Sequence, residues 1–259
     1  MSRGQSPLRA CHGLAPKVAR PAVPQIGACF CRGVPRSPRA HVSGGIFHVT
    51  SRGNRRTDVF LDDPARLRFL QMLTRTITRS GWRCLAYCLM TNHFHLVVEM
   101  EKATLSEGMH WLNGCYAQWF NRRYGFKGRL FEDRFHSEPV ESDAHLLELS
   151  RYLPLNPVRA GICSHPGDWR WSSYREMLGR DRTEFLSTGP MLALFGRTQK
   201  TARAAYEEFV RDGLTRVRQE HAWGTVPRTW LDQPKPYTPG NRWAMTRTSS
   251  PTGRPTTLR

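Results

Sequence analysis

Two histidines separated by a single residue, His93 and His95, lie in an apolar segment that reads as a β-strand. Because side chains alternate along a strand, both imidazoles face one side of the sheet and Phe94 faces the other. Two imidazoles at this spacing can hold one metal ion. In a chain of this length with ten histidines, chance alone gives roughly 0.4 such pairs, so the pair needs support from a second element.

Tyr152 and Asn156 supply that second element, because residues four apart on a continuous helix present their side chains on one face. A phenol that loses its proton is a nucleophile. A divalent cation held by two imidazoles and an amide oxygen would keep positions open for a phosphodiester oxygen and would stabilise the charge that develops on attack. The residues predict phosphodiester cleavage by Tyr152. The alternative is a helix tyrosine that only packs on the sheet.

Pro154 lies between these two residues and affects the geometry that they require. It has no N–H, and its ring would clash with the carbonyl of Ser150 in a straight helix. We therefore expect a kink that carries the Asn156 amide away from the metal while the Tyr152 phenol still reaches phosphorus.

A different metal site can be drawn from Cys84, Cys88, His93 and His95, whose ligand types suit tetrahedral zinc. The competing interpretation treats the two cysteines as small buried residues of an apolar strand, since no other cysteine pair has a matching spacing. A nucleic-acid-binding zinc protein is therefore one alternative function.

Two clusters of polar and cationic side chains could deliver a nucleic acid strand to either site. The first basic cluster comprises Arg52, Asn54, Arg55 and Arg56. The second basic cluster comprises Arg122, Arg123, Lys127, Arg129 and Arg134, interleaved with Tyr124, Phe126 and Phe131. Cations neutralise phosphates and aromatic rings stack on unpaired bases, so both clusters predict DNA contact. The alternative is a solvated basic surface over core aromatics.

The composition agrees with a polyanionic partner. The 259 residues include 39 Lys and Arg against 21 Asp and Glu, which gives a net charge of +18, and a field of this sign concentrates phosphate. No segment approaches the ~18 to 20 apolar residues of a membrane span, so a membrane protein is not expected. The odd number of cysteines, seven, and the lack of an apolar signal core predict a protein of the reducing cytoplasm.

Short strands and amphipathic helices alternate through the middle of the chain. Strands are predicted over 45–51, 82–90 and 93–100, the last two as a hairpin, and helices over 63–80, 105–124 and 142–157. Thr104 and Glu107 predict a capping box for the second helix. This pattern indicates an α+β fold with an antiparallel sheet and packed helices.

Five separated blocks, in this order, resemble the single-tyrosine HUH transposases, and most closely their REP-associated tyrosine transposase branch. The blocks are 47–54 (FHVTSRGN), 90–98 (MTNHFHLVV), 128–131 (GRLF) with Arg134 and Phe135, Arg151 and Tyr152 with 155–161 (LNPVRAG), and 171–174 (WSSY).

The resemblance implies a ferredoxin-like core with an antiparallel sheet and packed helices. It assigns His93 and His95 to a Mg²⁺ or Mn²⁺ site, with Asn156 in the place of a glutamine of relatives, and two imidazoles favour Mn²⁺. It makes Tyr152 the nucleophile that cleaves single-stranded or hairpin DNA, leaving a 5′-phosphotyrosine and a free 3′-hydroxyl. Arg159 joins the DNA-binding candidates.

The sequence leaves open whether the protein cleaves DNA and whether it forms a dimer. A domesticated relative could bind DNA hairpins with little or no cleavage, since a basic scaffold binds DNA without a working nucleophile. A homodimer is also compatible with the sequence.

The charge and composition divide the chain into four regions. Residues 1–40 carry seven cationic and no acidic side chains and are rich in Pro, Gly and Ala, which predicts a disordered basic arm or extension. We expect the catalytic domain over 41–180, a helical accessory region over 181–240 and a disordered basic tail over 241–259.

Overall fold

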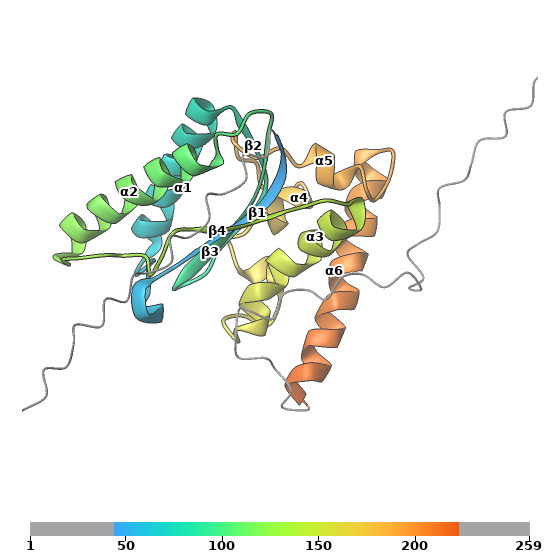
Figure 1. Ribbon diagram of the computed structural model, residues 1–259. Helices are drawn as coiled ribbons and strands as arrows, with labels where there is room; N and C mark the ends of the chain where they lie inside the picture. Colours follow the sequence, from blue (N-terminus) through green and yellow to red (C-terminus); the bar gives the residue numbers. More distant parts are fainter. Residues whose placement is uncertain (1–43, 223–259) are drawn as a thin grey trace, which may run out of the picture. The chain divides into compact units, whose positions relative to one another are not determined.

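The computed structural model describes residues 44–222, whose centre is a four-stranded antiparallel sheet with the order β2-β3-β1-β4 (Figure 1). The strands are β1 (Gly45–Arg52), β2 (Trp82–Leu89), β3 (His93–Met100) and β4 (His136–Pro139). With its helices the chain runs β-α-β-β-α-β through this sheet, which is the ferredoxin-like arrangement. The predicted α+β fold is confirmed.

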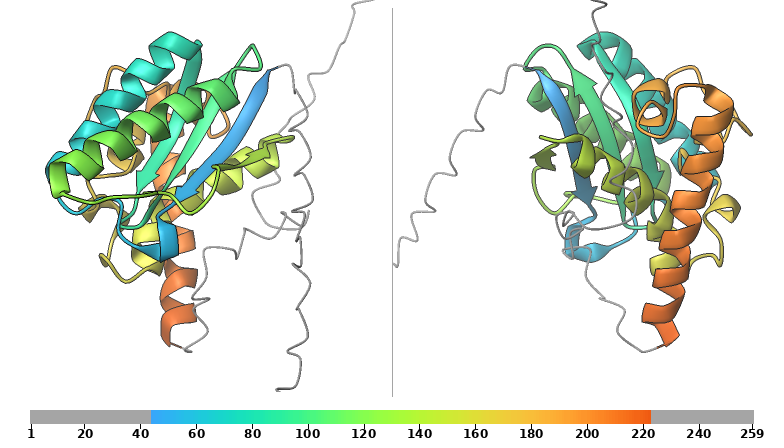
Figure 2. Two further views of the ribbon diagram at one scale, coloured as in Figure 1. Left: turned by 60° about the vertical axis from the view of Figure 1, so that its left-hand side comes forward. Right: turned by 90° about the vertical axis from the view of Figure 1, so that its right-hand side faces the viewer.

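The long helices cover both faces of the sheet. α1 (Asp63–Ser80) and α2 (Leu105–Tyr124) lie on one face, and α3 (Asp143–Arg159) and α6 (Gln199–Ala222) lie on the other (Figures 1 and 2). The short elements are η1 (Asn54–Arg56), η2 (Pro166–Asp168), α4 (Tyr174–Met177) and α5 (Gly189–Leu192). Among residues 44–222 no helix combines the length and the apolar character that crossing a bilayer demands.

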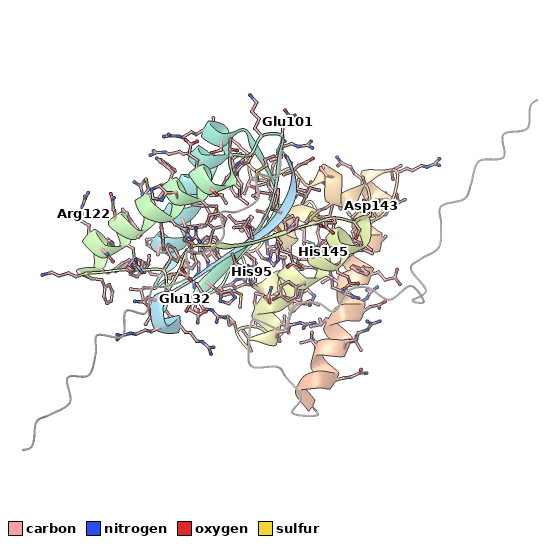
Figure 3. All side chains as sticks on the ribbon, viewed as in Figure 1. His95, Glu101, Arg122, Glu132, Asp143 and His145 are labelled. Carbon is pink, nitrogen blue, oxygen red and sulfur yellow. The ribbon has the colours of Figure 1, made fainter. Side chains whose placement is uncertain are left out.

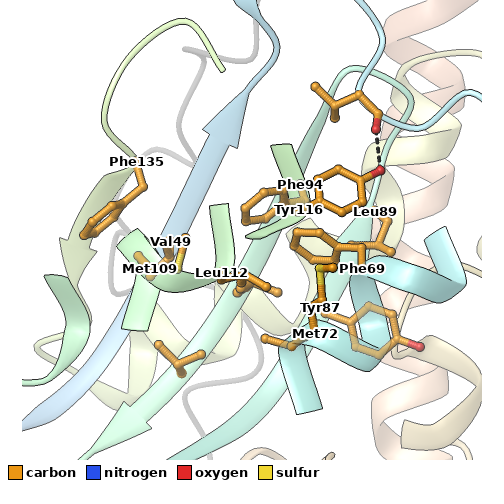
Figure 4. Close-up of a cluster of buried hydrophobic side chains, with 14 of the residues drawn as sticks. Val49, Phe69, Met72, Tyr87, Leu89, Phe94, Met109, Leu112, Tyr116 and Phe135 are labelled. Atoms are coloured by element: carbon orange, nitrogen blue, oxygen red, sulfur yellow. Dashed lines mark hydrogen bonds between the residues drawn. The ribbon is translucent and has the colours of Figure 1, made fainter. Parts of the chain in front are cut away.

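The face covered by α1 and α2 holds an aromatic core. Phe94 from β3 packs against Phe69 of α1, with ring centroids 4.6 Å apart, and Phe69 in turn meets Tyr116 of α2 at 5.2 Å. The buried hydroxyl of Tyr116 donates a hydrogen bond of 2.6 Å to the carbonyl of Val59 (Figure 4). Phe94 thus points into this core, and strand alternation directs its two neighbours to the opposite face.

A side-chain cap begins α1 and a glycine ends it, whereas the cap predicted for α2 is absent. The Asp62 carboxylate accepts from the amide of Ala65 at 2.8 Å, and Gly81 ends α1 in the left-handed region with φ of 68°. The predicted capping box at Thr104 is wrong, because its side chain makes no cap hydrogen bond. Its hydroxyl donates instead to the Ser80 carbonyl and accepts from the Trp82 indole, each at 3.0 Å.

α3 is one continuous helix through both of its prolines. It begins after Ser142, whose hydroxyl accepts from the amide of His145 at 3.2 Å, and it ends at Arg159, beyond the end expected at Pro157. Pro154 therefore does not break the element that carries Tyr152 and Asn156.

The sequence pattern missed β4, a short polar edge strand that pairs antiparallel with β1. At the other edge, residues 169–187 run along β2, where Leu89 donates its amide to the Trp171 carbonyl and Ser187 donates to the Cys84 carbonyl, each at 2.8 Å. This segment covers an edge that would otherwise be open to pairing.

The regions predicted at the two ends of the chain, 1–40 and 241–259, lie outside the described residues. α5 and α6 lie within residues 181–240, where the sequence predicts an accessory helical region.

Candidate active site

Three imidazoles gather on the sheet face that α3 covers. His93 and His95 point to this face from β3, with ring centroids 5.0 Å apart. His48 from the neighbouring strand β1 stacks on His95 at 5.2 Å. His95 is only 1% exposed and lies between the sheet and α3 (Figure 3).

Hydrogen bonds fix how His93 is protonated. The Asn92 amide nitrogen donates to the Arg56 carbonyl at 3.1 Å, which turns its Oδ1 toward His93. That oxygen lies 2.7 Å from His93 Nδ1 and can only accept, so Nδ1 carries the proton. The lone pair of His93 is therefore on Nε2.

His95 has the same arrangement with a different partner. Its Nδ1 lies 3.0 Å from Nε2 of His48, and its own Nε2 is buried without a hydrogen-bond partner. If Nδ1 donates to His48, Nε2 of His95 carries a lone pair, as in metal-binding imidazoles whose other nitrogen donates to a neighbouring group.

α3 brings the predicted nucleophile to these rings. Tyr152 meets His95 and His48 edge-on, with ring centroids 5.6 Å and 6.2 Å apart. Asn156 and Arg159 follow on the same helical face, one and two turns later. Tyr152 and Asn156 are each 9% exposed, and the helix runs through Pro154 between them without interruption.

The donor set fits a divalent cation. The unpartnered Nε2 of His95 and the lone pair on Nε2 of His93 supply two ligands, and Asn156 would add its side-chain oxygen, since its buried, unpartnered Nδ2 is a hydrogen-bond donor and not a ligand. Two imidazoles with an amide suit Mn²⁺ better than Mg²⁺, which prefers oxygen ligands.

Arg52 brings a positive charge to this site. It is the register partner of His93 across β1 and β3, and its guanidinium interacts electrostatically with both His93 and Tyr152. Burial lowers the pKa of Arg52 to about 10, and the nearby Glu132 carboxylate opposes this shift. The side chain is still a cation at neutral pH, next to the phenol.

The three imidazoles are neutral at pH 7. Burial, followed by the charges of His145 and His136, lowers the pKa of His48 to about 3. Burial and the charge of Arg52 lower the pKa of His93 to about 4. Burial likewise holds the pKa of His95 well below its ordinary value. A neutral imidazole has a lone pair, so these shifts keep the site able to bind a cation.

The family to which the site belongs follows from comparison with known proteins. Residues 41–155 match the family model described as IS200-like transposase. These residues belong to the IS200-like transposase family. The family predicted from the sequence blocks is thereby confirmed, and the matched segment contains His93, His95 and Tyr152.

Two solved structures of transposases are similar to the chain. One is a REP-associated tyrosine transposase bound to a REP hairpin, with 17% identity over 61% of this chain and 93% of that chain and a TM-score of 0.48. The other is a candidate transposase from Deinococcus radiodurans, with 18% identity over 45% of this chain and 94% of that chain and a TM-score of 0.34. No curated protein matches the chain.

The two basic clusters adjoin each other along the backbone. The amide of Asn54 donates to the Leu130 carbonyl at 2.7 Å, and Gly53 forms a β-bridge with Phe131. A Cβ on Gly53 would lie 2.0 Å from the Thr57 carbonyl oxygen, so only glycine fits there. The loop of the first basic cluster and the connection that carries Lys127, Arg129 and Arg134 are therefore joined through their backbones.

Backbone strain marks the exposed part of this surface. Arg55 and Arg56 have φ of 53° and 61°, in the left-handed region that side chains other than glycine rarely adopt. Such conformations cost on the order of 1 kcal/mol each and concentrate at functional sites. Both guanidinium groups are exposed, which suits phosphate contact.

The second basic cluster offers one ring for base stacking. Phe126 is 54% exposed and lies parallel to Phe120, with ring centroids 5.7 Å apart. Tyr124 instead donates to the Asp62 carboxylate at 2.7 Å, and Phe131 is buried in the core. The cationic members are exposed, and Arg122 lies at the end of α2 away from His95 (Figure 3).

The zinc alternative is wrong. Residues 44–222 contain no group of three or more His, Cys, Asp or Glu side chains that could hold a metal ion together. Cys84 and Cys88 are completely buried, and burial raises the pKa of Cys84 to about 12, so its thiol stays protonated. The two cysteines are core residues, as the competing interpretation has it.

Sequence reasoning missed His48 as part of the site. The residue stands in the recognised block 47–54, and strand alternation places it on the same face as Thr50 and Arg52. Its contact with His95 depends on β1 lying beside β3, a pairing between residues 47 positions apart that the local pattern does not contain.

We expect the metal-free protein to lose stability as the pH falls from about 7.5 to about 5. The fold keeps His48 and His93 neutral, whereas the unfolded chain protonates both near the ordinary histidine pKa of 6.5, so the unfolded state binds more protons below that pH. Each imidazole then costs about 1.4 kcal/mol of unfolding free energy per pH unit below 6.5, until its folded-state pKa is reached.

Urea denaturation followed by tryptophan fluorescence measures this pH dependence. His110→Gln, which changes an exposed imidazole on α2, serves as the control and should retain the pH dependence of the wild type. An unfolding free energy that stays constant over this range would contradict the buried neutral state of the three imidazoles.

Proposed function

We propose that the protein is a DNA strand transferase of the REP-associated branch of its family, which cleaves and rejoins single-stranded or hairpin DNA through Tyr152. The observation that carries the proposal is the phenol ring of Tyr152 at 5.6 Å from His95, whose Nε2 is buried and unpartnered. Nucleophile, cation ligands and the positive charge of Arg52 share one face of the sheet.

In the proposed reaction, Tyr152 Oη attacks a backbone phosphorus and a new O–P bond forms. The bond from phosphorus to the 3′ oxygen breaks, the phenolic proton passes to water, and the departing 3′ oxygen takes up a proton. The products are a 5′-phosphotyrosine and a free 3′-hydroxyl. One phosphoester bond replaces another, so attack by a 3′-hydroxyl on the phosphotyrosine can rejoin DNA without ATP.

His93, His95 and Asn156 are the residues that would hold the divalent ion, preferably Mn²⁺. When bound, the ion would polarise a phosphoryl oxygen and stabilise the charge that develops on attack. The protein contributes the rest through its own groups. Arg52 attracts the phosphate to the phenol, and the partners of His93 Nδ1 and His95 Nδ1 hold both rings in place.

A covalent adduct assay tests the proposal. The substrate is a pool of hairpin oligonucleotides with randomised single-stranded flanks, labelled with one dye at the 5′ end and another at the 3′ end. We expect Mn²⁺ to produce a protein band that survives SDS and carries the 3′ label alone, and EDTA to abolish this band. The retained label reports the polarity of cleavage.

The same assay distinguishes the proposed cleavage from the alternative function, hairpin binding without cleavage. A protein that shifts labelled hairpins in a native gel but forms no adduct with Mn²⁺ or Mg²⁺ would be a hairpin-binding protein without cleavage. The exposed, strained arginines of η1 would then act in binding alone.

We expect hairpin affinity to fall steeply with salt and the fall to depend on the first basic cluster. If Arg55 and Arg56 each contact a phosphate, the double variant R55Q/R56Q lowers the slope of log K against log salt by about 1 to 2, because each lost contact removes about 0.7 to 0.9. Fluorescence anisotropy of a labelled hairpin, recorded between about 50 and 200 mM salt, measures this slope. Arg197→Gln, an exposed arginine outside both clusters, should leave the slope unchanged, and an equal effect of both changes would argue for diffuse charge attraction.

A further inference from the structure

A proline inside the helix that carries Tyr152 leaves one backbone carbonyl without its usual donor. In a regular helix the Ser150 carbonyl accepts from the amide four residues later, and that residue is Pro154, which has no N–H. The hydroxyl of Tyr206 on α6 donates to this carbonyl at 3.1 Å. Ser150 and Tyr206 are each only 2% exposed, so water does not compete easily for the bond.

Two further contacts of α6 flank the same turn of α3. The guanidinium of Arg151 lies 4.4 Å from the ring centre of Phe209. A Cβ on Gly213 would lie 2.5 Å from Arg151 Cδ and 2.8 Å from Leu155 Cδ1, so this glycine lets the two helices approach closely. Figure 1 shows α6 running alongside α3.

The three α6 residues follow helical spacing and meet α3 on both sides of Tyr152. A helix that lacks an internal hydrogen bond can bend at that turn, and a buried carbonyl without a donor favours such an opening. A bend there would change the direction of the Tyr152 ring relative to His95 and His48, against which it now packs edge-on.

We infer that Tyr206 is a positioning residue for the nucleophile: its hydroxyl replaces the amide that Pro154 lacks and holds the turn of α3 that aims Tyr152 at His95. The inference rests on the proposed function for its catalytic consequence. It also gives α6, which lies outside the matched residues 41–155, a role in the site.

The first test removes only the hydroxyl. We expect Tyr206→Phe to lower the single-turnover rate of adduct formation about 10- to 100-fold, the scale of a small misplacement of reacting groups, while the hairpin Kd stays within about twofold. Amide hydrogen exchange over residues 150–158 should accelerate in the same variant. Tyr174→Phe is the matched control: Tyr174 is buried, its ring is 5.9 Å from that of Tyr206, and within the described chain no hydrogen bond joins its hydroxyl to α3.

The second test restores the missing donor by another route. Pro154→Ala provides a backbone N–H four residues after Ser150, so the double variant P154A/Y206F should recover both slow exchange and most of the cleavage rate. A purely structural contribution of the Tyr206 hydroxyl elsewhere in the core would not be rescued at residue 154.

The outcomes separate this inference from the proposed function. A wild-type protein that forms no adduct would overturn the proposed function, and the exchange measurements would still test the hydrogen bond. Two results would overturn the inference: wild-type cleavage and exchange rates in Tyr206→Phe, or a double variant P154A/Y206F that is as impaired as Tyr206→Phe. In either case the adduct formed by the wild-type protein would still support the proposed function.

Discussion

Tyr152→Phe should abolish the covalent adduct with hairpin DNA and leave hairpin binding intact. The change deletes one oxygen and retains the ring that packs edge-on against His95 and His48. Because the oxygen is the proposed nucleophile, we expect the rate of adduct formation to fall by at least about 10⁴-fold, as when other enzymes lose the group that attacks. Gel analysis of the labelled adduct measures the rate, and fluorescence anisotropy measures the hairpin Kd.

Tyr116→Phe is the control for this substitution. Tyr116 is a buried tyrosine whose hydroxyl donates to the Val59 carbonyl, and it lies on α2, on the opposite side of the sheet and outside both basic clusters. The control should form the adduct at the wild-type rate. An adduct that persists in Tyr152→Phe would assign the attack to another residue, which peptide mapping by mass spectrometry would then identify.

Much of this site could be predicted because it depends on local periodicity. Strand alternation alone places His93 and His95 on one face with Phe94 on the other, and the spacing of Tyr152 and Asn156 requires only a continuous helix. These relations involve residues within four positions of each other. They are therefore present in the sequence whatever the rest of the fold does.

The parts that could not be predicted depend on contacts between distant segments. His48 joins the site because β1 pairs with β3, and β4 forms because its polar residues pair with β1 rather than because of their own strand propensity. The two basic clusters adjoin through backbone hydrogen bonds from Asn54 to Leu130, 76 positions later in the numbering, and from Glu132 to Arg52.

Tertiary partners also overruled two sound local arguments. Thr104 has the residue type and spacing of a capping box, but its hydroxyl bonds Ser80 and Trp82 instead. Pro154 predicts a kink in the helix, but α3 continues through it, and Tyr206, 52 positions later, supplies a donor to the carbonyl that the proline leaves free. In both places a side chain from another element satisfies the group on which the local rule depends.

Substitution of either strand histidine should weaken the binding of Mn²⁺, and this affinity can be measured without DNA. His95→Phe removes both nitrogens of a completely buried ring, so we expect Mn²⁺ affinity, measured by calorimetry or by electron paramagnetic resonance, to fall by about 100-fold or more, beyond what loss of a supporting residue costs. His93→Phe changes a more exposed ring and should have a similar effect, which keeps the test valid if the first variant is unstable. His110→Gln should bind Mn²⁺ as the wild type does. Wild-type affinity in both strand variants would mean that the two imidazoles do not hold the ion, and the charge on the phosphate would then have to be met by Arg52 alone.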